Sequence, residues 1–240
     1  MSADPAPLGA RAQLASLARA AAAAASGRRK FAGLEHLPDA PSARPAAVLI
    51  LFGALDSTPS DRDAEADVVS RDLDVLLLAR ATTMRSHAGQ VAFPGGRVDP
   101  EDDGPVAAAL REAREETGLD PTGVEVLGPL EAVPLSFSLN VVTPVLAWWR
   151  HPSPVRVVDE AESSDVFRAP VADLLDPANR GSTVIRREGG EWRGPGFLLP
   201  DARGGHLVWG FTGMLLTALF DRLGWTEPWN EERELPFSWP

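Results

Sequence analysis

Residues 111–119, REAREETGL, are the most informative part of this chain for both its fold and its chemistry. On an α-helix, which turns by about 100° per residue, Glu112, Glu115 and Glu116 fall on one side. The opposite side collects Val106, Leu110, Ala113 and Thr117. Like charges three and four residues apart destabilise an isolated helix, so these carboxylates either need a compensating cation or form a solvated face. Hard divalent ions such as Mg²⁺ bind through oxygen ligands and supply such a charge.

A glycine-rich, acidic loop precedes this helix and favours the metal interpretation. Gly95 and Gly96 lead into RVDPEDDG, residues 97–104, and we expect the helix itself at residues 104–117. Gly118 then stands at a position suited to a left-handed C-terminal cap. Because glycine lets the backbone pass close to a metal, the Gly96 carbonyl is a candidate ligand beside the three glutamates.

Together these residues resemble the Nudix box, G-x5-E-x7-R-E-U-x-E-E-x-G-U. The matching positions are Gly96, Arg111, Glu112, Glu115, Glu116, Gly118 and Leu119. The resemblance implies an α/β fold, the Nudix-type α/β/α sandwich with a mixed β-sheet. It also implies a Mg²⁺ or Mn²⁺ cofactor held by the glutamates, with Arg111 orienting them.

The loop departs from the motif by one residue. Counting forward from Gly96 reaches Asp102, whereas counting back from Arg111 reaches Asp103, and both are Asp where the motif has Glu. In the family this loop acid usually braces the arginine. We therefore expect either Asp102 or Asp103 to pair with Arg111.

A second motif lies directly upstream, LLLARATTMRSHAGQVAFPGG at residues 76–96. It resembles the signature LLTxR(S/A)x3Rx3Gx3FPGG of the coenzyme A pyrophosphatase branch of Nudix hydrolases, with Leu78 in place of the threonine. VWGFT, residues 208–212, is similar to the WG-x-T segment of that branch. The resemblance covers residues 46–223.

The arginines of this motif are candidate substrate ligands. Arg80 and Arg85 carry planar guanidinium groups, which bind phosphate oxygens in two-pronged fashion. The alternative for Arg80 is an ion pair with a loop acid such as Asp99. His87, alone in a loop, is expected to be a structural hydrogen-bond partner and not the catalyst.

The resemblance predicts metal-dependent hydrolysis of the diphosphate bond of coenzyme A or an acyl-CoA, giving phosphopantetheine or its acyl derivative and adenosine bisphosphate. Glu115 and Glu162 are both candidates for the base that takes the proton of the attacking water. One alternative is a Nudix hydrolase of ADP-ribose, a dinucleotide or a nucleoside triphosphate. A catalytically silent, nucleotide-binding Nudix module is another, although it would be expected to lack some of the glutamates.

Composition narrows the class of protein further. The chain has 240 residues, a net charge of −11 and no cysteine. The charge disfavours binding to long nucleic acids but leaves room for a small phosphorylated substrate. The chain has no run of eighteen apolar residues, so we expect no membrane span. The lack of cysteine excludes disulfides and thiolate chemistry and fits a cytoplasmic protein.

We expect three regions along the chain: an alanine-rich, helical or partly disordered extension at 1–45, a Nudix domain at 46–224, and a tryptophan-rich acidic tail at 225–240. The expected strands are 47–52, 74–80, 124–133 and 140–149. The expected helices are 10–26, 104–117, 171–175 and 211–223. We also expect a loop at 152–164 and a glycine-rich hairpin at 185–208. The tail is expected either to lie over its own domain or to contact a homodimer partner.

Overall fold

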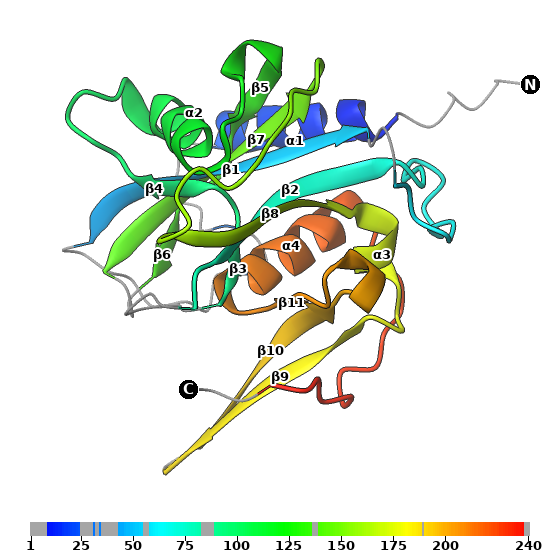
Figure 1. The fold of residues 1–240 in the computed structure, drawn as a ribbon. Coiled ribbons are helices and arrows are strands. Elements are labelled where there is room, and N and C mark those ends of the chain that lie inside the picture. The colour runs from blue at the N-terminus through cyan, green and yellow to red at the C-terminus, as the bar shows by residue number, and fades with distance from the viewer. Residues whose placement is uncertain are drawn as a thin grey trace, which may run out of the picture.

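A computed structural model describes residues 9–24, 31, 34, 43–54, 58–82, 89–135, 139–188 and 190–237 of the protein. Figure 1 shows a main β-sheet with helices on its two faces and a smaller, separate sheet below it. None of the helices in these ranges combines the length and the apolar character needed to cross a membrane.

The main sheet is mixed and is centred on β1 (Arg44–Ala54). This strand runs parallel to β7 (Asn140–Trp149) and antiparallel to β2 (Leu73–Arg80). The strand order is β3-β2-β1-β7-β5, where β3 is Val91–Ala92 and β5 is Val124–Pro129. Three further strands pair with members of this order: β4 (Gly95–Arg97) with β1, β6 (Val133–Leu135) with β7, and β8 (Ser163–Pro170) with β2.

Both faces of the main sheet are buried, and alternate residues of β1 show how. Ala47, Leu49 and Leu51 pack with the apolar side of α2 (Gly104–Thr117). Their neighbours Ala46, Ile50 and Phe52 belong to the larger core on the opposite face, to which α1 (Ala10–Ala24) and α4 (Gly210–Leu223) contribute. Since a strand directs successive side chains to opposite faces, this pattern requires a helical layer on each side. The expected α/β/α sandwich with a mixed sheet is confirmed.

The second sheet follows α3 (Val171–Leu175) and contains β9 (Arg180–Arg187), β10 (Gly190–Leu198) and β11 (Leu207–Val208) in the order β11-β10-β9.

The C-terminal tail, red in Figure 1, lies along this second sheet through backbone hydrogen bonds between Ser182 and residues 233 and 235. Trp225 at the start of the tail is 1% exposed, and its Nε1 donates to Gln13 of α1 at 2.7 Å. Of the two placements expected for the tail, the described residues adopt the one over their own domain.

The helices at 104–117 and 171–175 and the strand at 140–149 have the bounds expected from sequence. The expected strand at 124–133 was wrong as a single element, because β5, which has a bulge between Val126 and Gly128, ends at Pro129 and β6 begins only at Val133. The loop expected to extend to residue 164 ends earlier, because Ser163 already belongs to β8, a strand that sequence periodicity did not reveal. The division into an extension, a domain and a tail stays a prediction.

Candidate metal and catalytic site

The helix α2 presents the candidate site, and local sequence explains its bounds. A proline stands in its first turn, where a missing N–H costs nothing, and Gly118 ends it at φ 69°, in the left-handed region. Ala108, Ala109 and Ala113 are fully buried against the sheet. Small side chains on this face let the helix lie close to β1, so the acidic face is held at a fixed height above the sheet.

Two glycines next to the helix form a cradle for its glutamates. Gly95 pairs with Val48 of β1 so closely that a Cβ atom at Gly95 would lie 2.4 Å from the Ala47 carbonyl oxygen. At Gly96, a Cβ atom would lie 2.4 to 2.7 Å from the carboxyl atoms of Glu112. Only glycine fits at position 95, where the nearest atoms include backbone, and at position 96 a side chain would displace the Glu112 carboxylate, which lies directly against the Gly96 backbone.

The three glutamates accept hydrogen bonds from two residues, Arg111 and Gly95. The Glu112 carboxylate accepts from Arg111 Nη1 at 3.0 Å, and so does the more exposed Glu115, also at 3.0 Å. Glu116 accepts from the Gly95 N–H at 2.9 Å. Glu112 lies between the other two glutamates. Its charge raises the pKa of Glu116, and the charge of Glu115 raises the pKa of Glu112. The acidic face expected from helical spacing is therefore present.

Arg111 is held by the loop acid Asp102. Its Nε and Nη2 donate to the two Asp102 carboxylate oxygens at 3.0 and 2.9 Å, and Nη2 also donates to the Arg97 carbonyl. With the bonds to the glutamates, all five N–H donors of the guanidinium are used. The pKa of Asp102 is lowered, first by this hydrogen bond. Of the two candidate aspartates, Asp102 is the partner, and Asp103 makes no side-chain cap to the helix.

Burial dominates the electrostatics of Glu116. Removal from water raises its pKa to about 7, and the negative charges of Glu112 and Glu162 act in the same direction. The Gly95 N–H and the positive charge of Arg80 oppose this rise. Burial also raises the pKa of Glu112. Two neighbouring carboxylates that are costly to ionise form an environment that a cation would stabilise.

Arg80 lies at the end of β2 on the same side as α2. Its N–H donates to the carbonyl of Gln90, the residue before β3, at 2.9 Å. The side chain is half-buried, and its Nε has no hydrogen-bond partner among the described residues. Asp99, named as an alternative partner of Arg80, lies 3.4 Å from Nη2 of Arg111. The Arg80 side chain is near enough to Glu116 for its positive charge to lower the pKa of that carboxyl group.

Three other residues singled out in the sequence have different outcomes. Glu162 is exposed, and its carbonyl accepts from the N–H of Ala81, the residue after Arg80, which places the loop at 159–162 beside the cluster. Arg85 and His87 lie outside the described residues. Sequence reasoning missed the roles of the Gly95 N–H and of Asp99. In the sequence, the only signal for the role of Asp99 is its position three residues before Asp102. In the structure, the Asp102 carboxylate accepts from the Asp99 N–H at 2.8 Å.

The donor set fits a hard divalent ion, because it consists of carboxylate oxygens beside a backbone cradle that any Cβ atom would fill. Within the ranges that the structure describes, no three acidic or histidine side chains converge on one point. The hydrogen bonds give the reason, since Arg111 engages Glu112 and Glu115 while Gly95 engages Glu116. An ion would compete with Arg111 for the oxygens of those first two glutamates.

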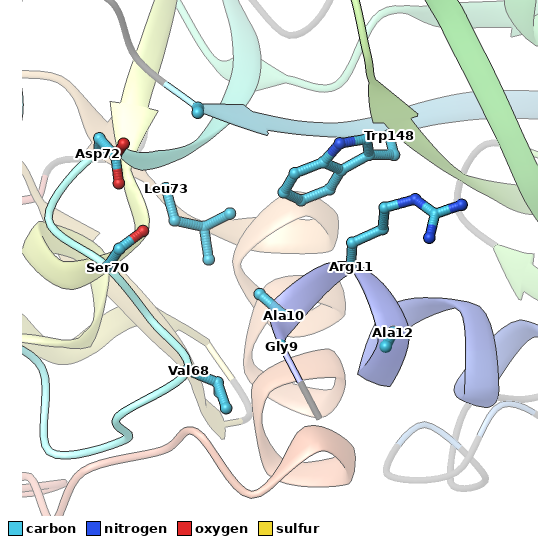
Figure 2. A pocket seen from close by; sticks show the side chains of 10 residues that line it. Gly9, Ala10, Arg11, Ala12, Val68, Ser70, Asp72, Leu73 and Trp148 are labelled. Carbon is cyan, nitrogen blue, oxygen red and sulfur yellow. The ribbon is translucent and has the colours of Figure 1, made fainter. Parts of the chain in front are cut away.

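A cavity of about 390 Å³ lies elsewhere, at the Ala54 end of β1. Figure 2 shows the Trp148 indole near the start of α1, with Arg11 beside it and Asp72 across the cavity. Gly96 pairs with Ala47 at the other end of the same strand, and seven strand residues span about 23 Å. None of the candidate site residues lines this cavity.

Comparison with known proteins accounts for this arrangement. A model of the NUDIX domain family matches residues 61–188, which include the glutamates, Arg111 and the loop acid. The chain belongs to the Nudix family. Nudix relatives include the proteins named "Uncharacterized Nudix hydrolase NudL" from Photorhabdus laumondii and Escherichia coli. The first is 36% identical over 146 residues, covering 60% of this chain and 74% of that protein. The second is 39% identical over 150 residues, covering 62% and 75%.

Solved Nudix structures are also similar to this chain. A MutT/nudix family protein from Enterococcus faecalis has a TM-score of 0.45 and 19% identity, covering 91% of this chain and 75% of that one. An Ap4A hydrolase from C. elegans has a TM-score of 0.39 and 21% identity, covering 52% and 80%.

Proposed function

We propose that this Nudix hydrolase uses Mg²⁺ or Mn²⁺ to cut the diphosphate bond of coenzyme A or an acyl-CoA. The products would be phosphopantetheine, or its acyl derivative, and adenosine bisphosphate. The observation that supports this proposal is the position of Arg80, whose positive charge acts on Glu116 and whose Nε has no hydrogen-bond partner among the described residues. A positive group beside a metal-binding carboxylate is where a substrate phosphate bound to that metal would need a partner.

The sequence around Arg80 supports coenzyme A as the substrate. Residues 76–96 match the signature of the coenzyme A pyrophosphatase branch at every fixed position except Leu78. Coenzyme A carries a diphosphate and a separate ribose phosphate, so it offers oxygens to more than one guanidinium group. Arg80 and Arg85 are proposed to bind them.

The proposed roles of the other residues follow from their contacts. Glu112, Glu115 and Glu116, with the Gly96 carbonyl, would hold the metal. A bound divalent ion neutralises diphosphate oxygens and lowers the pKa of a water molecule. Arg111, fixed by Asp102, positions Glu112 and Glu115 through its Nη1. The Gly95 N–H holds Glu116, and the Gly95–Gly96 backbone excludes side-chain atoms from the cradle.

A base must take the proton of the attacking water, and Glu115 and Glu162 are the two candidates. Glu115 bonds to Arg111, whereas the exposed Glu162 side chain has the freedom to turn toward a substrate. Replacing each by Gln and measuring turnover at saturating Mn²⁺ distinguishes them. The true base loses rate with little loss of metal affinity, while a metal ligand loses both. Glu160, exposed in the same loop, is the control, and E160Q should behave as the native protein.

The substrate assignment is tested by incubating the protein with coenzyme A and Mn²⁺ and identifying the products by mass. The same assay with ADP-ribose, a diadenosine polyphosphate and a nucleoside triphosphate covers the other Nudix substrates. A tenfold or greater preference for ADP-ribose over coenzyme A would refute the coenzyme A assignment. Release of no phosphorylated product from any of these would instead favour a nucleotide-binding module.

A further inference from the structure

The helix on the far side of the sheet reaches the candidate site through one buried hydroxyl group. Thr212, in the first turn of α4, is 5% exposed, and its Oγ1 donates to the Val91 carbonyl at 2.9 Å. Val91 belongs to β3, a strand of two residues at the edge of the main sheet. The bond therefore joins α4 to the chain segment that leads into the Gly95–Gly96 cradle.

The Val91 carbonyl needs this partner. Arg80 N–H donates to the Gln90 carbonyl, and in an antiparallel ladder the next residue then turns its carbonyl away from the paired strand. No other strand of the main sheet lies beyond β3 within the described residues. A buried carbonyl left without a donor destabilises its segment, so the Thr212 hydroxyl completes the bonding of β3.

The short strand β3 in turn fixes both halves of the site. On one side it pairs with Leu78 and Ala79 of β2, next to Arg80. On the other side, three residues beyond Val91, the Pro94 carbonyl accepts from Leu49 and the Gly95 N–H holds Glu116. A shift of β3 would therefore move Arg80 and the Glu116 contact together.

The Thr212 end of this connection is rigid. A Cβ atom at the next residue, Gly213, would lie 2.7 Å from the Pro195 carbonyl oxygen, so α4 packs tightly on β10. Val208 pairs with Phe197, and the Trp209 ring lies 4.3 Å from the ring of Phe237 in the tail. Because the start of α4 is tightly packed, Thr212 holds β3 at a fixed position.

We propose that Thr212 is a positioning residue for the metal and substrate site, acting through Val91 on the opposite side of the sheet from α2. This inference rests on the proposed metal site, and not on coenzyme A as the substrate. It gives a structural role to the VWGFT segment, which ends at this threonine.

The test compares T212V with T183V. Thr183 is a fully buried threonine in the second sheet, and its hydroxyl donates to the Gly194 carbonyl at 3.2 Å, so its valine variant removes the same chemistry at a distance from the site. Both variants should lower the melting temperature. Only T212V should weaken Mn²⁺ binding, by about tenfold in Kd by calorimetry, the lower end of what loss of a supporting contact costs a metal site. T212S, which keeps the hydroxyl, should restore the native Kd.

Three results would overturn the inference: native Mn²⁺ affinity in T212V, an equal loss in T183V, or no recovery in T212S. If T212V does not fold, T212A removes the hydroxyl without placing a methyl group against the Val91 carbonyl and is judged by the same criteria. A native protein that binds Mn²⁺ but does not cleave coenzyme A would contradict the proposed substrate while leaving this comparison intact. A native protein that binds no Mn²⁺ would overturn the metal site and the role of Thr212 together.

Discussion

Asp102 and Arg111 form a two-pronged ion pair, with Oδ1 3.0 Å from Nε and Oδ2 2.9 Å from Nη2. The pair leaves Nη1 to bind Glu112 and Glu115. The one-residue insertion in the loop thus follows Asp102, and the acid counted forward from Gly96 is the one that braces the arginine.

Loss of that brace should weaken the metal site. In D102N one charged acceptor becomes an amide that donates as well as accepts, so Arg111 loses its orientation. We expect about a 10- to 100-fold loss of Mn²⁺ affinity or activity, as for other residues that support metal ligands. D103N is the matched control, since Asp103 makes no side-chain cap. Equal losses in the two variants would contradict the assignment of Asp102.

The Gly96 cradle gives a second prediction. In G96A the new methyl group would overlap the Glu112 carboxylate, which must then move. We expect the variant to fold but to lose the rise in melting temperature that Mn²⁺ gives the native protein. G190A is the control, because nothing lies within 4 Å of a Cβ atom there. Native-like metal stabilisation in G96A would show that this contact does not matter.

Glu116 makes stability depend on pH when metal is removed by a chelator. Because its pKa is raised from 4.5 to about 7, its contribution to stability is present below pH 4.5 and is lost as the pH rises through 7. The change corresponds to at most about 3 kcal/mol. E116Q should remove this dependence, so that the metal-free variant melts above the native protein at pH 8. If the melting temperatures of the two metal-free proteins changed in parallel from pH 5 to 8, the prediction would be contradicted.

Arg80 should act on substrate more than on metal. We expect R80A to lower kcat/KM for coenzyme A by about 10- to 100-fold, because a charge-assisted bond to phosphate contributes about 1.5–3 kcal/mol. R80K keeps the charge but not the planar fork and should recover only part of the loss. R97A, at an exposed arginine on the neighbouring strand β4, should have little effect. Equal losses in R80A and R97A would indicate a general charge effect.

The tail should be part of the cooperative fold. Trp225 packs edge-on against Phe52 of β1, with ring centroids 6.2 Å apart, and bonds to Gln13. W225A should therefore cost about 3–5 kcal/mol in free energy of unfolding by denaturant titration. W192A, at a tryptophan that is 39% exposed, should cost much less. A similar small cost in both would mean that the tail packs only loosely.

Helix α2 was predictable because its causes are local. The period of the alanines fixes the buried side, the glycine at 118 fixes the end, and the spacing of the glutamates places them on the other side. Strand β8 was not predictable in this way. Its sequence, SSDVFRAP, shows no regular alternation of buried and exposed residues, and only its pairing with β2 shows that it is a strand.

The amino-acid order alone therefore specified the acidic helix, the glycines before it and the candidate arginines, because each is recognised from residues that lie close together in the chain. Tertiary structure decided which aspartate holds Arg111, where the Arg80 guanidinium stands, and how far burial raises the pKa of Glu116. Those properties depend on sheet register and on distance from water. Both arise only when β1, β2, β3 and β8 have paired and α2 has packed upon them.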